Sequence, residues 1–257
     1  MTFSRTVCAL ALLSSLGTYS ISASANEANG ETIYPYVLFS GVDFVKNASE
    51  GYVGGMVSLN GDLDTDGFLM RVLGTRGWFE YDRSIPQADA DYWQADVMVG
   101  YQIIRNAVTY TGYVGVEYQE YDLSPDDPTA QLRGDEFGFK AAWDIETERY
   151  FKRPFYAAVR GSYSTSFDTY YTIARLGLNV DRFAIGPEAW VMGDASGDAS
   201  RVGGFVLTDL SLGGSSIGTL SVSGGYQFVD NADHPTGDNF GEEGAYGTVK
   251  FTMAFGE

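Results

Sequence analysis

The sequence has few of the residues on which many catalytic and cross-linked sites depend. It contains one cysteine, Cys8, and one histidine, His234, among 257 residues. Cys8 lies in an N-terminal segment that we expect to be removed, so the mature chain would carry no thiol. This excludes disulfides, thiol nucleophiles and cysteine-ligated metals. A single histidine also gives weak support to any site in which an imidazole base activates a nucleophile.

Basic residues are scarce as well. The chain has 16 Lys and Arg against 34 Asp and Glu, which gives a formal net charge of −18. Removal of Arg5 with the N-terminal segment changes −18 to −19. A protein this acidic is not expected to bind nucleic acid, and it has no polybasic patch for anionic lipid.

Long apolar runs are missing from most of the chain. After residue 25 there is no run of about 18 apolar residues, the length that a transmembrane helix needs. The first 25 residues contain Arg5, a short apolar segment at 7–16 and the small residues Ala23-Ser24-Ala25. This order is typical of a secretory signal. We therefore predict a signal peptide at 1–25 and one domain at 26–257.

Tyrosine, phenylalanine and glycine are abundant, with 18, 16 and 32 residues, and apolar residues alternate with polar ones. The alternation is clearest at 136–146. Its even positions include Glu136, Lys140, Asp144 and Glu146, whereas its odd positions are Phe137, Phe139, Ala141, Trp143 and Ile145. Because a strand points successive side chains to opposite faces, this segment predicts a sheet with one apolar and one polar face.

The pattern recurs about twelve times along the mature chain. It predicts an all-β fold, an antiparallel up-and-down transmembrane β-barrel of about 12 strands. The alternation does not fix the registers of the first, third and tenth strands. The predicted strands lie near 33–44, 50–60, 67–82, 92–104, 107–121, 134–146, 154–167, 169–180, 183–194, 200–212, 218–229 and 244–255.

Aromatic residues and connection lengths indicate a barrel in an outer membrane. Trp93 and Tyr101 share one strand face, and eight residues of tilted strand separate them by roughly 20 Å in height, close to the spacing of two aromatic girdles. If the N-terminus lies in the periplasm, the connections 82–91, 122–133, 194–199 and 230–243 face outward and are mostly long and acidic. The connections 104–107, 180–183 and 212–218 face inward and are short, which is the asymmetry expected of such barrels.

Two short motifs suggest chemistry but have simpler interpretations. Residues 214–218 match G-x-S-x-G, yet the predicted topology separates Ser216 from His234 by the membrane, so we interpret the motif as a hairpin turn. Residues 62–67 resemble the opening of a calcium loop. Leu73 occupies the twelfth position, where a bidentate glutamate is needed, so an acidic turn is favoured. No catalytic residue, metal site or cofactor is predicted.

Polar and aromatic side chains on the inward face of the predicted strands form the candidate site. One interpretation is an internal lattice of ion pairs that holds the wall together. The other is a path for a saccharide, in which aromatic rings stack on sugar faces and charged groups bond the hydroxyls. Carboxylate pairs could also serve a glycosidase, although nothing in the sequence fixes their separation. The candidate residues are Asp96, Glu117, Glu136, Lys140, Asp144, Arg160, Arg175, Glu188, Trp190 and Tyr246.

Several segments resemble the bacterial cellulose biosynthesis protein family BcsS, in order from about Ser40 to the end of the chain. The most specific are 123–128 (LSPDDP) with 133–140 (RGDEFGFK), and 161–170 (GSYSTSFDTY). Shorter matches are 40–43 (SGVD), 59–63 (LNGDL), 66–69 (DGFL), 99–102 (VGYQ), 185–188 (IGPE), 201–205 (RVGGF) and 244–248 (GAYGT).

The resemblance implies an outer-membrane accessory protein of cellulose biosynthesis, and it carries no activity or catalytic residue over to this chain. One departure from many outer-membrane barrels is the C-terminus, which ends Phe255-Gly256-Glu257 instead of in an aromatic residue. The leading hypothesis is a non-enzymatic barrel that assists export or anchoring of the polysaccharide. Its expected partners are outer-membrane lipid, cellulose or another exopolysaccharide, and the cellulose synthase machinery. The alternatives are a barrel enzyme acting on glycan or lipid, and a sealed structural barrel.

Overall fold

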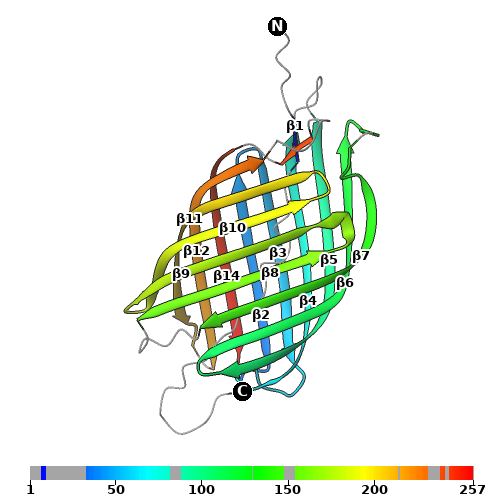
Figure 1. The fold of residues 1–257 in the computed structure, drawn as a ribbon. Coiled ribbons are helices and arrows are strands. Elements are labelled where there is room, and N and C mark those ends of the chain that lie inside the picture. The colour runs from blue at the N-terminus through cyan, green and yellow to red at the C-terminus, as the bar shows by residue number, and fades with distance from the viewer. Residues whose placement is uncertain are drawn as a thin grey trace.

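In the computed structural model, twelve antiparallel strands form a closed barrel (Figure 1). The structure describes residues 7–9, 33–81, 88–128, 130–147, 154–213, 215–230, 238–240 and 243–256. Each strand pairs with its neighbour in the chain, and the last strand closes the ring by pairing with the first. Among the described residues, no helix is both long and apolar enough to cross a membrane.

The predicted strand number and topology are confirmed. The barrel strands are β2 (Tyr36–Val45), β3 (Ala48–Ser58), β4 (Gly67–Tyr81), β5 (Ala88–Arg105), β6 (Val108–Ser124), β7 (Gly134–Thr147), β8 (Phe155–Ser164), β9 (Tyr170–Val180), β10 (Phe183–Asp194), β11 (Gly197–Ser211), β12 (Ser216–Asp230) and β14 (Gly244–Phe255). Two further strands of three residues, β1 (Val7–Ala9) and β13 (Asp238–Phe240), pair in parallel outside the barrel ring.

Several predicted boundaries are wrong, mostly because strands extend into segments assigned to loops. β5 and β6 stay paired as far as Asp89 and Ser124, so parts of the predicted loops 82–91 and 122–133 are strand. Aspartate has a low β-propensity, but ladder pairing satisfies its backbone N–H and C=O groups and overrides that preference. The predicted loop 194–199 shrinks to a turn at Ala195 and Ser196, between β10 and β11.

The strand predicted at 154–167, which is β8, ends earlier than predicted. β8 stops at Ser164, and a 3-10 turn, η1 (Ser166–Asp168), connects it to β9. Phe167 has φ +48°, in the left-handed region that a strand residue does not adopt. The alternation of the sequence continues through this segment, so the turn left no signal in the pattern.

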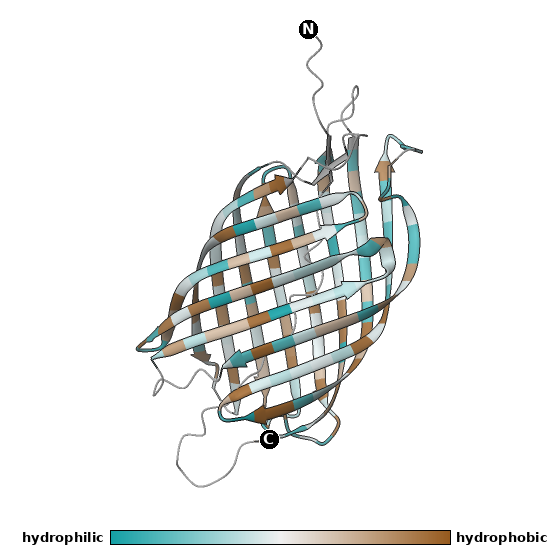
Figure 2. Cartoon of the chain, in the orientation of Figure 1, coloured by the Kyte–Doolittle hydropathy of each residue, from teal (hydrophilic) through white to brown (hydrophobic). Residues whose placement is uncertain are grey.

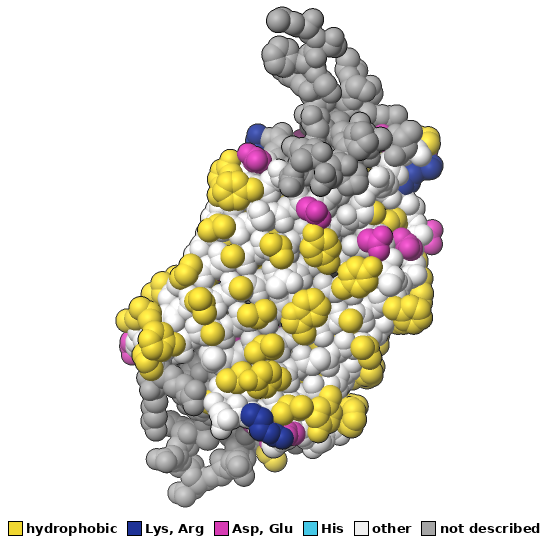
Figure 3. All heavy atoms as spheres, in the orientation of Figure 1, with side chains coloured by type: hydrophobic (Ala, Val, Ile, Leu, Met, Phe, Trp, Pro, Cys, Tyr) yellow, Lys and Arg dark blue, Asp and Glu magenta, His cyan; other side chains and the backbone are white. Residues whose placement is uncertain are grey.

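The strands separate an outward apolar face from an inward mixed face. On β7, Phe137 and Phe139 are 64% and 72% exposed, whereas Lys140 and Asp144 are 3% and 1% exposed. Figure 2 shows hydrophobic and hydrophilic residues alternating along the strands. On the face drawn in Figure 3, hydrophobic side chains are spread over the middle of the wall and charged ones lie toward its ends. This is the distribution that a lipid-facing wall requires.

The two ends of the barrel carry different connections. We call the end with Tyr36, Phe255 and the two-residue turns at 106–107 and 181–182 the near end. The opposite, far end carries the β6–β7 connection, η1 and the β10–β11 turn. The strands therefore enter the connections predicted to face outward at one end and those predicted to face inward at the other, as up-and-down pairing requires. Residues 82–87, 129, 231–237 and 241–242 of the outward set lie outside the described residues.

Candidate functional site: the barrel interior

The ten predicted site residues all lie on the inward face of the wall. Nine of them are at most 5% exposed, and Glu136, near the far end, is half-buried. The structure thus places these side chains toward the lumen. Contact with a saccharide stays a prediction.

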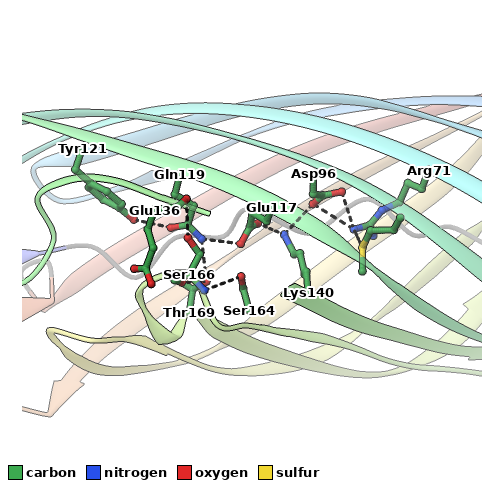
Figure 4. A network of polar contacts seen from close by, with 11 residues as sticks. Arg71, Asp96, Glu117, Gln119, Tyr121, Glu136, Lys140, Ser164, Ser166 and Thr169 are labelled. Carbon is green, nitrogen blue, oxygen red and sulfur yellow. Dashed lines mark hydrogen bonds and ion pairs between the residues drawn. The ribbon is translucent and has the colours of Figure 1, made fainter. Parts of the chain in front are cut away.

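A chain of ion pairs crosses β4 to β7 in the lumen (Figure 4). Arg71 Nη2 lies 3.2 Å from Asp96 Oδ1, and Lys140 Nζ lies 2.8 Å from Asp96 Oδ2. Lys140 also pairs with Glu117, and Gln119 Nε2 donates to Glu117 Oε2 at 2.7 Å. Each charge therefore meets an opposite charge on another strand, which offsets the cost of burying it.

Glu136 holds the β8–β9 connection against the far end of the barrel. Its Oε2 accepts a hydrogen bond from the backbone N–H of Phe167 at 2.8 Å, and its backbone carbonyl accepts one from the Ser166 hydroxyl. The Phe167 ring packs edge-on against Tyr121 at 4.9 Å, and the Phe167 carbonyl accepts a hydrogen bond from Ala195 N at 2.8 Å. Because these contacts reach from β6 to the β10–β11 turn, η1 covers part of the far mouth.

The near mouth is covered in a similar way by the β3–β4 turn. Gln102, on the inward face of β5, donates through Nε2 to the carbonyls of Leu63 at 2.7 Å and Thr65 at 3.1 Å. Leu63 N donates to the carbonyl of Tyr34 at 3.0 Å, and both side chains are buried. The turn is therefore folded inward over the opening.

Arg160 forms a separate group with two carboxylates of β7. Its Nε lies 2.7 Å from Asp144 Oδ2, and its Nη2 pairs with Glu146. The hydroxyl of Tyr156 donates to Glu146 Oε1 at 2.9 Å. The two carboxylates are thus paired with the same guanidinium.

A third group joins β9 to β14 and β2. Arg175 Nε lies 2.7 Å from Glu188 Oε2, and the Tyr246 hydroxyl donates to Glu188 Oε1 at 2.8 Å. Arg201 donates through Nη1 and Nη2 to Asp43 at 2.9 and 3.0 Å.

Aromatic rings complete this third group. The Arg201 guanidinium carbon lies 5.2 Å from the centre of the Trp190 ring and 4.8 Å from that of Tyr246. Lys250 Nζ lies 4.9 Å from the Trp190 ring centre. These distances are those of cation–π contacts, so Trp190 and Tyr246 are occupied by the protein's own cations.

Several important lumen residues were missed from the sequence. Asp43, Arg71 and Arg201 lie on β2, β4 and β11, the strands whose registers the alternation did not fix. On each of these strands both faces are largely apolar, so the alternation of apolar and polar residues is too weak to show which face points inward. An isolated charge within such a strand is the one signal that could have placed them inside.

Within the part of the chain that the structure describes, some buried polar atoms lack a hydrogen-bond partner, and many of them lie on β3, β4 and β5. They are Glu50 Oε1, Arg71 Nε and Nη1, Thr75 Oγ1, and both amide atoms of Gln94. Thr75 and Gln94 are directly opposite each other in the β4–β5 ladder. Since buried polar groups are nearly always bonded, this part of the lumen is where water or a polar ligand could bond.

Inward-facing glycines let aromatic rings lie close to the wall near these atoms. A Cβ on Gly77 would lie 2.1 Å from the hydroxyl oxygen of Tyr92, so only glycine leaves room for the ring. The Tyr92 hydroxyl then donates to Glu50 Oε2 at 2.7 Å. The glycine therefore positions the one hydrogen-bond donor that Glu50 has from β5.

The two short motifs take structural positions. Ser216 begins β12 at the near end, and His234 lies outside the described residues. In the acidic turn, Asp62 Oδ1 accepts a hydrogen bond from Asp64 N at 3.0 Å. Asp66 accepts one from Ile104 N at 2.8 Å and pairs with Arg105 at 2.7 Å. These donors lower the pKa of Asp66, the Ile104 N–H most of all.

Comparison with known proteins adds a family to this geometry. The family described as cellulose biosynthesis protein BcsS matches residues 37–255, which include every barrel strand except the first residue of β2. The chain belongs to the BcsS family. The resemblance seen in the loop and hairpin motifs is thereby confirmed, and the BcsS barrel is assigned to cellulose biosynthesis. No curated protein matches the sequence.

Two solved structures resemble the BcsS barrel at low identity. The translocator domain of the autotransporter NalP from Neisseria meningitidis is 11% identical with a TM-score of 0.47, and the match covers 89% of this chain and 90% of that one. The β-domain of the Bordetella autotransporter BrkA is 12% identical with a TM-score of 0.40, and the match covers 88% of this chain and 100% of that one. Similarity at this level does not indicate a shared function.

Proposed function

We propose that this BcsS-family chain is a non-enzymatic outer-membrane barrel that anchors or scaffolds the cellulose synthesis machinery and is not an open conduit for the polymer. The observation that carries the proposal is the pairing of the lumen charges. Each charged site residue predicted from the sequence, on β5 to β10, contacts an opposite charge or, for Glu136, a backbone N–H. Removing one partner of such a buried pair is strongly destabilising, so these charges are committed to the wall and are not free to bind a passing polymer.

The inward-folded η1 and β3–β4 turns also support a closed barrel. A conduit would need both mouths open, whereas Ser166 and Leu63 are 0% and 5% exposed. The outward apolar wall supports membrane residence, and the predicted signal peptide at 1–25 supplies the export route. On this proposal, the partners in the membrane are lipid and the synthase machinery, and cellulose is contacted at the loops of the far end.

The test is a planar-bilayer measurement combined with fractionation. The mature barrel should be recovered in the outer-membrane fraction with heat-modifiable migration on gels, and the mass of its N-terminal peptide should show cleavage after Ala25. It should conduct negligibly in a planar bilayer. Recovery as a soluble periplasmic protein, or sustained conductance by the purified barrel, would overturn the proposal.

A saccharide path is the second candidate, and the unpaired atoms of β3–β5 favour it. Gln94 and Thr75 offer an amide and a hydroxyl that could bond sugar hydroxyls. A conducting barrel whose current is blocked by soluble cello-oligosaccharides would support this candidate. If Gln94→Leu also removed the block, the path would be assigned to the β3–β5 wall.

A further inference from the structure

The outer wall of the barrel carries a groove that crosses β14, β2, β3, β4 and β5. It has a volume of about 720 Å³. Its floor is made of small side chains and bare backbone at Ser40, Gly51, Gly74 and Ala95. Larger outward side chains, among them Trp93, Val249 and Phe251, line its sides. The groove therefore exists because small residues adjoin one another on neighbouring strands.

The strand registers make the groove one continuous feature. Gly74 pairs with Val53 on β3 and with Ala95 on β5, and Val53 pairs with Ser40 on β2. Ser40 in turn pairs with Phe251 on β14. Because paired residues point to the same side, these positions form one outward row.

Arg76 provides the groove with a positive charge at one end. Its side chain is 81% exposed, and it lies 3.9 Å from Asp91, whose side chain is 60% exposed. An ion pair this long and this exposed contributes little, so most of the arginine's charge is available to another anion.

The height of Arg76 places that charge near the edge of the apolar band. Arg76 lies nine residues from the near end of β4 at Gly67 (76 − 67), which is about 23 Å of height for a strand tilted near 40°. Val249 lies six residues from the near end of β14 at Phe255 (255 − 249), closer to the middle of the wall. The groove therefore descends from a cation at the interface into the apolar region.

We propose that this groove binds one phosphate-bearing anionic lipid of the surrounding bilayer, with its phosphate on Arg76 and an acyl chain along Gly74 and Gly51 toward Val249. The site uses a single arginine and an apolar groove, so it requires no polybasic patch. Near the interface a lipid-facing wall tolerates an arginine, and a lipid phosphate there gives its guanidinium a charge-assisted hydrogen-bonding partner. The inference depends on the membrane residence proposed above.

Trp93 gives the site its own reporter. A variant with Trp78→Phe and Trp143→Phe keeps Trp93 as the outward-facing tryptophan of the described residues, and Trp190 is buried in the lumen. The variant is folded into phosphatidylcholine vesicles that contain equal small amounts of brominated phosphatidylglycerol or brominated phosphatidylcholine. Bromine quenches indole fluorescence on contact. We expect phosphatidylglycerol to be preferred about fivefold at Trp93, because one arginine near the surface attracts an anionic lipid by about 1 kcal/mol.

The control variants separate the arginine from a general charge effect. Arg76→Gln in the same background should reduce the preference to about onefold, and Arg182→Gln, at an exposed near-end turn, should leave it unchanged. Heat-modifiable migration on gels verifies that each variant is folded. Equal quenching by both lipids in the chain with Arg76 would overturn the inference.

A second reporter distinguishes failure of the site from failure of membrane residence. Trp143 is outward-facing on β7, and a variant with Trp78→Phe and Trp93→Phe keeps it alone on the wall. Quenching of Trp143 without any quenching of Trp93 would mean that protein, such as a second copy, covers the groove, and would overturn the lipid site alone. Absence of quenching at both tryptophans would overturn membrane residence itself.

Discussion

Arg201 and Arg71 are both fully buried arginines, yet the barrel satisfies them to different degrees. Arg201 uses all three guanidinium nitrogens, with Nε donating to Gln227 at 2.8 Å and both Nη atoms donating to Asp43. Arg71 donates through Nη2 to Asp96 and to the sulfur of Met98, and its other two nitrogens have no hydrogen-bond partner among the described residues. The wall around Arg201 is thus fully hydrogen-bonded at this guanidinium, whereas the described residues leave polar atoms of the β3–β5 wall unbonded.

The difference indicates two roles within one interior. The Arg201 group joins strands β11 and β2, which are separated by β12 and β14 in the ring, so it braces the barrel across its closure. On the β3–β5 wall, buried donors and acceptors of Arg71, Thr75 and Gln94 have no hydrogen-bond partner among the described residues. Since an unpaired buried polar group costs free energy, this wall is the place to look for ordered water or a polar ligand.

The largest effect is expected from breaking the completed wall. Arg201→Met leaves the Asp43 carboxylate buried without its cation, and removal of one partner of a buried pair costs about 3–5 kcal/mol. The variant should unfold at a much lower urea concentration when it is measured by tryptophan fluorescence in vesicles. Arg182→Met, at an exposed turn, is the control and should unfold like the parent. An unchanged Arg201→Met midpoint would show that the group does not brace the barrel.

Arg71→Met should cost less than Arg201→Met. Asp96 keeps Lys140 as a partner at 2.8 Å, so the carboxylate is not left without a cation. The variant also removes two nitrogens, Nε and Nη1, that have no hydrogen-bond partner among the described residues. We expect a loss of about 1–3 kcal/mol by the same urea titration. A loss of stability equal to or greater than that of Arg201→Met would contradict the comparison. It would mean that Arg71 makes hydrogen bonds beyond those to the described residues.

Gln94→Leu should be neutral or should stabilise the barrel by about 1 kcal/mol. Neither the donor nor the acceptor of the Gln94 amide has a hydrogen-bond partner among the described residues. The substitution puts an apolar group of similar size in place of that amide. Gln119→Leu is the matched control on the next strand, and it should destabilise because Gln119 bonds Glu117 and Thr169. Destabilisation by Gln94→Leu would indicate that water or a ligand already completes this wall.

The smallest effect concerns an exposed pair at the near end, outside the lumen. The Ile104 N–H and Arg105 lower the pKa of Asp66 in the folded state. Its contribution to stability is therefore fully present above the ordinary aspartate pKa of about 3.9 and is lost as the pH falls through the lower folded value. As the pH is lowered across this acid range, the urea midpoint of Asp66→Asn should decrease less than that of the parent. Identical pH profiles would show that the contact contributes nothing.

The sequence predicted the fold more completely than the site. The faces of β7 could be assigned because Phe137 and Lys140 differ strongly in polarity, and β5 could be assigned from Trp93 and Asp96 in the same way. On β4 the inward Leu69 and Leu73 and the outward Met70 and Val72 are all apolar, so Arg71 could not be placed. The position of η1 could not be predicted either. Phe167 continues the alternation of apolar and polar residues in the sequence, although the backbone leaves the strand conformation there.

By itself the sequence determined the barrel, its twelve strands, the BcsS family and the inward direction of the predicted charges. These follow from a period of two residues and from short motifs, both of which are local properties of the chain. Only the tertiary structure decided which charges pair, which mouths the turns cover and where the outer wall is grooved. Asp43 and Arg201 are 158 residues apart in sequence and meet only because the barrel closes. Which side chains meet across the closed sheet depends on the strand register and on the shear of the barrel. Neither can be read from the sequence of a single strand.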